Sequence, residues 1–139
     1  MLKIKLAIIG ALALFYGANG LAMFFTPETW YGMVPGVPDT GPFNAHFIRD
    51  IGLIYATLSV ALILALSVRR LLYPLTLLPC IWVGLHAGLH LWDIAADRLP
   101  LEHLLIDLPG VFAPALLHGV LSWWVKPDWE ASLTADPSQ

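Results

Sequence analysis

The sequence predicts an all-α integral membrane protein, a four-helix bundle with both termini in the cytoplasm. The 139 residues are 58% hydrophobic and only 12% charged, whereas soluble domains are about 25% charged. Four segments also reach the roughly 20 apolar residues that a helix needs to cross about 30 Å of hydrocarbon. Because a chain of this length has room for one domain, we expect residues 1–139 to form a single four-span transmembrane domain.

The predicted spans cover about residues 3–25, 44–68, 71–95 and 100–125. The first resembles a secretory signal at its start, but its apolar run continues to Phe25, so we interpret it as a retained helix.

The connection between the first two spans is rich in proline and glycine and cannot be a span. Its start, TPETWYGMV, places Thr26 as an N-cap, Pro27 at the first helical position and Glu28 in the first turn. This pattern predicts one short interfacial helix in the first outer loop. At the other end of the chain, the polar residues 127–139 are expected to form a poorly ordered cytoplasmic tail.

The positive charges predict the orientation, because short cytoplasmic loops retain Lys and Arg. Five of the seven such residues fall on one side of the predicted spans: Lys3, Lys5, Arg69, Arg70 and Lys126. Both termini are therefore expected to face the cytoplasm of a bacterial cytoplasmic (inner) membrane, with the lipid bilayer as the first partner. A net charge of −3 excludes nucleic acid as a partner.

Ionisable side chains gather at the predicted outer ends of three spans. Span two begins NAHFIRDIG, span three ends HAGLHLWD, and span four begins EHLLID. The histidines and aspartates in these motifs share helix faces at i, i+3, i+4 or i+7, and such residues in a membrane are candidates for function because they are costly to bury there. The sequence therefore predicts one polar pocket below the outer surface.

Imidazole and carboxylate groups are ligands of zinc, iron, copper and manganese. The first hypothesis is accordingly a transition-metal site whose identity the sequence leaves open. The aspartates either complete the metal's ligands or orient the histidines. The candidate metal-binding residues are His46, His86, His90, His103, Asp50, Asp93 and Asp107.

Two other ligands suit the same residues. A b-type haem needs two axial histidines, and Arg49 is the candidate cofactor-binding residue that would pair with a propionate. A quinone would hydrogen-bond to a histidine and an aspartate that shuttle protons. The paired histidines of span three favour a cofactor or a proton path over packing alone.

Other features of the spans are interpreted as structural. His118 lies deeper than the other histidines, so we expect a single, satisfied imidazole. Pro109 is expected to kink the fourth span. Gly84 and Gly88, four residues apart, are typical of close helix packing.

The arrangement resembles that of small four-helix bacterial membrane proteins of the DoxX-like kind. The resemblance depends on GANGLAMFFTPETW at the end of the first span and FIRDIGLIYATLSVAL at the start of the second. It implies a subunit or partner of a quinone-linked oxidoreductase in the cytoplasmic membrane, and no functional residue is transferred from it.

Two functional hypotheses follow. In the first, the metal supports redox or hydrolytic chemistry at the membrane, with a metal-bound water as the reactive group if the protein is an enzyme. In the second, the protein is a non-catalytic accessory subunit of a larger quinone-linked or haem-containing membrane complex. In that case the polar layer only holds the bundle together, and an oligomer or another membrane subunit is the expected partner.

Overall fold

A computed structural model of the chain describes residues 1–134. The described part is helical, and four of its helices are long and apolar enough to cross a membrane, as predicted. In chain order the long helices are α1 (Leu2–Phe25), α3 (Ala45–Ser67), α4 (Leu72–Ala95) and α6 (Ala113–Thr134). Shorter elements connect them: α2 (Pro27–Met33), the 3-10 turns η1 (Val37–Thr40) and η2 (Arg69–Leu71), α5 (His103–Ile106) and the π-helical turn η3 (Leu108–Phe112).

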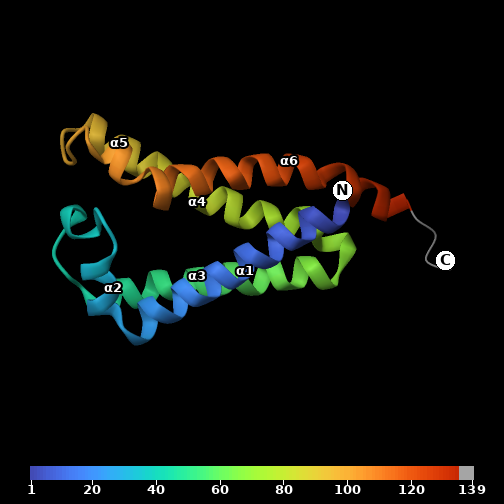
Figure 1. The fold of residues 1–139 in the computed structure, drawn as a ribbon, viewed down its shortest axis with the longest axis horizontal. Coiled ribbons are helices and arrows are strands. Elements are labelled where there is room, and N and C mark those ends of the chain that lie inside the picture. Colours follow the sequence, from blue (N-terminus) through green and yellow to red (C-terminus); the bar gives the residue numbers. More distant parts are fainter. Residues whose placement is uncertain (135–139) are drawn as a thin grey trace.

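The long helices form two antiparallel hairpins, α1 with α3 and α4 with α6 (Figure 1). The start of α1 and the end of α6 lie at one end of the molecule, which we call the terminal end. The elements α2 and α5 lie at the opposite end, which we call the loop end. Figure 1 shows the hairpins close together at the terminal end and diverging toward the loop end.

The first hairpin is held together by a close approach of backbones. A Cβ atom on Gly20 would lie 2.6 Å from the carbonyl oxygen of Gly52. About two turns further along, Ser59 Oγ donates a hydrogen bond of 2.7 Å to the carbonyl of Ala13. Small residues let membrane helices approach in this way. By contrast, the predicted packing of Gly84 and Gly88 is not seen, because neither has an atom within 4 Å of an added Cβ among the described residues.

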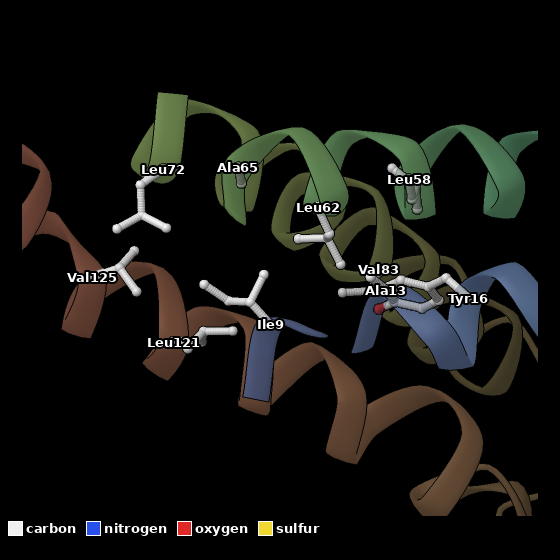
Figure 2. Close-up of a cluster of buried hydrophobic side chains, with 10 residues drawn as sticks. All are labelled: Ile9, Ala13, Tyr16, Leu58, Leu62, Ala65, Leu72, Val83, Leu121 and Val125. Atoms are coloured by element: carbon white, nitrogen blue, oxygen red, sulfur yellow. The ribbon is translucent and has the colours of Figure 1, made fainter. Parts of the chain in front are cut away.

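The shared core of the two hairpins lies toward the terminal end (Figure 2). Its buried side chains come from all four long helices: Ile9, Ala13, Tyr16, Leu58, Leu62, Ala65, Leu72, Val83, Leu121 and Val125. In the candidate spans only 22% to 33% of the residues in the most apolar windows are buried. The outward faces are apolar as well, with Leu14 76% exposed and Leu116 70% exposed, which suits contact with lipid and not with water.

The connecting segments agree in part with the sequence. The expected interfacial helix is α2, with Pro27 at its start and Glu28 in its first turn. However, Thr26 makes no side-chain cap, because its hydroxyl bonds back to the Ala22 carbonyl. The predicted fourth helix is interrupted near Pro109 by η3, as expected for a proline that removes a helical hydrogen bond.

The tail differs from the prediction. Helix α6 continues through Pro127 to Thr134, and residues 135–139 of the expected tail lie outside the described residues. Contacts with the first hairpin and with η2 hold this extension. Lys5 Nζ pairs with Asp128 at 2.5 Å, and Trp129 Nε1 donates a hydrogen bond of 2.8 Å to the carbonyl of Arg70.

Candidate functional site

A buried carboxylate at the loop end joins two histidines. Oδ2 of Asp107 lies 2.8 Å from Nδ1 of His90 and 3.1 Å from Nδ1 of His103. All three residues are at least nine-tenths buried. A carboxylate oxygen in this position accepts a hydrogen bond from each Nδ1–H, so Asp107 sets the orientation of both rings and leaves each Nε2 free for another partner.

Local helix geometry brings these residues together. His103 and Asp107 lie at i and i+4 across α5, where one turn of helix places them on one face. Asp107 ends that turn, and its carbonyl accepts from the amide of Val111 at 2.8 Å and that of Phe112 at 3.2 Å. The wider π turn forms immediately before α6, and His90 reaches the carboxylate from the last turns of α4.

His86 extends the group deeper along α4. The ring centroids of His86 and His90 are 4.7 Å apart, and the rings meet edge to face. On its other side, His86 stacks against Trp82 with a centroid distance of 6.3 Å and nearly parallel rings. We use the name His–Asp cluster for His86, His90, His103 and Asp107, all of which the sequence analysis singled out.

The sequence analysis missed Asp39 as a neighbour of the cluster. Its Oδ2 lies 3.4 Å from Nε2 of His103, although more than 60 residues separate the two in the chain. Gly36, with a positive φ of 81°, lets the loop approach this closely, since a Cβ there would lie 2.8 Å from Oδ1 of Asp107. The available signal was the run Gly36-Val37-Pro38-Asp39, whose glycine, proline and aspartate are typical of a tight turn but do not indicate what the turn contacts.

An open pocket of about 490 Å³ lies beside the cluster at the loop end. It is lined by Asp39, Pro100, Glu102, His103 and Ile106. His103 is 2% exposed and forms part of the pocket wall. The pocket therefore reaches His103, whose Nδ1 contacts the buried Asp107.

The other predicted ligands do not join the cluster. His46 pairs instead with Asp50 on the surface of α3, at 3.3 Å, with side chains 89% and 56% exposed. Asp93 pairs with Arg98 at 3.1 Å. The expectation of one pocket shared by three spans is thus wrong for His46 and Asp50, because α3 packs mainly on α1 and the two hairpins diverge toward the loop end (Figure 1). Asp93, although it lies on α4, contacts Arg98 in the following loop and not the cluster.

Arg49 also lies apart from the cluster. Its Nε donates a hydrogen bond of 3.1 Å to the carbonyl of Phe24, at the end of α1. This contact ties the start of α3 to the end of α1, which is a structural role.

The arrangement offers a metal fewer ligands than predicted. Across residues 1–134, no group of three or more His, Cys, Asp or Glu side chains is placed so that it can hold a metal ion. Asp107 is oriented toward the Nδ1 atoms of its two histidines, the position of an orienting acceptor. The residues as arranged do not form a coordination site by themselves.

A second buried polar pair lies in the middle of the bundle. The hydroxyl of Tyr16 and Nε2 of His118 are 2.5 Å apart, and their rings stack with centroids 5.5 Å apart. Both side chains are almost fully buried. The expectation that His118 is satisfied holds for one nitrogen only, because Nδ1 has no hydrogen-bond partner among the described residues.

Comparisons with family models, with curated proteins and with solved structures find no match to this chain. The resemblance to DoxX-like proteins therefore stays a prediction, and the argument about function depends on the site itself.

Proposed function

We propose that this protein is a multi-pass membrane protein whose His–Asp cluster takes up and delivers protons at the outer face of the membrane. The single observation that supports it most is the position of Asp107 between Nδ1 of His90 and Nδ1 of His103. A carboxylate between two imidazoles stabilises a proton on either ring and offers a short path between them.

The alternation of carboxylate and imidazole groups supports the same proposal. From the pocket inward, the order is Asp39, His103, Asp107, His90 and His86, with nitrogen–oxygen distances of 3.4, 3.1 and 2.8 Å and then a ring contact. An imidazole accepts a proton on one nitrogen and releases one from the other. When a proton binds at His103 Nε2, the Nδ1 proton of His103 can move to Asp107. If His90 then carries its own proton on Nε2, Asp107 can pass the proton to His90 Nδ1 on the spanning helix α4.

The loop end is the outer end in this proposal. The basic residues near the termini and in η2 belong to the opposite end, and short cytoplasmic segments retain such residues. The bacterial cytoplasmic membrane is the proposed location. A quinone or another membrane subunit is the proposed partner, because either could exchange protons with histidines near the outer leaflet.

A second candidate function is transition-metal binding. It is favoured by the Nδ1 contacts of Asp107, because histidines that ligate metals commonly donate their other nitrogen to a carboxylate. The ligating atoms would be the Nε2 atoms of His90 and His103, and the remaining ligands would have to come from a rearrangement or from a partner. Bound metal would supply a Lewis acid or a redox centre there.

Ligand titration of histidine-labelled protein separates these functions. The purified protein in lipid nanodiscs contains five histidines, whose ring ¹⁵N signals can be assigned with single His→Ala variants. A short-chain benzoquinone, Zn²⁺ and haem are added in separate titrations. The proposal predicts that the quinone shifts the signals of His86 and His90 saturably and leaves exposed His46 unchanged.

Each other outcome has a defined meaning. A saturable shift with Zn²⁺ alone, at one ion per chain, would favour the metal site, and a Soret band with haem that is lost in His90→Ala would favour haem. If no probe shifts the cluster signals, the proton-transfer proposal is wrong for these ligands. The cluster would then only hold helices together by hydrogen bonds within an accessory subunit.

A further inference from the structure

Buried polar side chains follow the interface between α4 and α6, which we call the seam. Among residues 1–134, the buried polar or charged side chains outside the first hairpin all lie on α4, on α6 or, for His103 and Asp107, on the segment that joins these two helices. They are not confined to the loop end but are spread along the bundle: His90, His103, Asp107, His118, Thr76 and Ser122. In the first hairpin the corresponding set is only Lys5 and Ser59.

Contacts along the seam show which residues of α4 lie level with which residues of α6. Near the loop end His90 meets Asp107, and nearer the terminal end Ser122 Oγ donates a hydrogen bond of 3.3 Å to the carbonyl of Thr76. This register places His118 about level with Cys80 on α4. At 1.5 Å per residue, His118 therefore lies roughly 9 Å along the axis from His86.

Two buried polar atoms lie in the interval between these histidines. Nε1 of Trp82 and Nδ1 of His118 are both inaccessible to solvent and have no hydrogen-bond partner in the described part of the chain. Unpartnered buried groups are rare, and an internal water is the common explanation. A water bound at Nδ1 of His118 would satisfy that nitrogen, and Trp82 lies on α4 at a level between the two histidines.

The seam continues below this pair to the terminal end. The hydroxyls of Thr76 and Ser122 lie buried on the two facing helices. Further along, Lys5 Nζ contacts Asp128 and the carbonyl of Trp124. Polar groups thus occur at successive levels from the pocket to the terminal end.

We propose that the seam conducts protons across the membrane, with the Tyr16–His118 pair and a buried water at Nδ1 of His118 as its middle section. The proposal extends the proposed function, since it uses the His–Asp cluster as the outer entry. A proton enters at the pocket, passes along the imidazoles and the internal water, and leaves beside Asp128. One positive charge crosses per event, so sustained flux requires a compensating ion.

The pair has features that a purely structural contact does not need. Tyr16 comes from α1 and His118 from α6, and Tyr55 of α3 meets the Tyr16 ring edge to face at 5.4 Å. An apolar pair would fill this space without the cost of buried polar atoms. The stacked rings instead retain one hydrogen bond and one free imidazole nitrogen, which is what a relay requires.

The test is proton flux into liposomes that contain the full-length protein. Potassium-loaded vesicles with a trapped pH-sensitive dye are diluted into potassium-free buffer, and valinomycin then creates an inside-negative potential. The wild type is expected to acidify the lumen faster than empty vesicles. Tyr16→Phe and His118→Phe, which keep ring size, are expected to lower the rate by about tenfold or more, because each removes a partner from the buried chain.

Controls make the result specific. His46→Ala removes an exposed histidine of the first hairpin and should leave the flux unchanged, and thermal unfolding checks that each variant is folded. Wild-type flux no higher than that of empty vesicles would overturn the conduction proposal. So would equal flux in wild type, Tyr16→Phe and Asp107→Asn. If the quinone still shifts the ring ¹⁵N signals of His86 and His90 in that case, the proposed proton transfer at the outer face stands. Only the proposed conduction across the membrane then fails.

Discussion

The two hairpins are held together by different means. In the first, α1 and α3 meet through Gly20 and Gly52 with almost no polar side chains between them. In the second, buried histidines and hydroxyls lie on both α4 and α6, and the segment that joins the two helices adds His103 and the buried carboxylate of Asp107. Close packing of small residues can therefore join two membrane helices with few buried polar side chains. The polar groups that the other pair buries at a cost are accordingly the candidates for function.

The largest expected effect comes from filling the glycine contact of the first hairpin. Gly20→Ala would put a Cβ 2.6 Å from one backbone oxygen and 2.9 Å from the backbone nitrogen of Ala56. Neither atom can move alone, so we expect a loss of about 3 kcal/mol of stability, at the upper end for overpacking. Thermal unfolding in detergent measures it.

Gly84→Ala is the matched control for that substitution. It adds the same methyl group at an open site of α4 and should be neutral or slightly stabilising, because alanine has the higher helix propensity. If Gly20→Ala unfolds at the same temperature as Gly84→Ala, the first hairpin is not held by this contact.

A smaller effect is expected at the centre of the His–Asp cluster. Asp107→Asn removes the charge that accepts from two imidazoles and should cost about 2 kcal/mol, as for other buried charged hydrogen bonds. Asp50→Asn, at an exposed ion pair, should cost almost nothing. Chemical denaturation of both variants would show the difference, and equal midpoints would argue against a buried hydrogen-bonded centre.

A still smaller loss of stability is expected when the ion pair that joins the hairpins at the terminal end is removed. Lys5→Met keeps the apolar stem but removes the contacts with Asp128 and the Trp124 carbonyl, and should cost about 1 kcal/mol because Asp128 keeps some solvent. Lys126→Met is the control, since its pair with Glu130 is long and exposed. Cleavage within the end of α6 by a protease that does not recognise lysine, such as chymotrypsin at Trp129, should become faster in Lys5→Met only.

The smallest expected effect on stability is that of Tyr16→Phe. Hydrogen bonds between membrane helices average about 0.6 kcal/mol, and the ring still packs in the core. A loss of stability well above this value would mean that the pair is mainly structural. Near-wild-type stability combined with lost proton flux would instead support its role in conduction.

Much of the fold could be predicted because it depends on local properties of the sequence. The length of each apolar run predicts the four long helices, and Pro27 with Glu28 predicts α2. The extension of α6 past Pro127 could not be predicted, because it depends on contacts with Lys5 and Arg70 that are more than 50 residues away.

The site was predictable within a helix and less so between helices. Spacing alone placed His86 beside His90 and His103 beside Asp107. It could not show that His46 and Asp50 stay with the first hairpin, since that depends on which face of α3 packs against α1. Asp39 was missed because a segment rich in prolines and glycines gives no periodicity from which to infer a contact.

The most direct test of the account is the protonation pattern of the histidine rings. Long-range ¹H–¹⁵N spectra of the histidine-labelled protein in nanodiscs should show Nδ1 protonated in both His90 and His103. Asp107→Asn should shift both sets of signals, whereas Asp50→Asn should shift neither. If His90 and His103 respond independently, or if neither responds to Asp107→Asn, the two imidazoles do not share one carboxylate and the proposed relay does not exist.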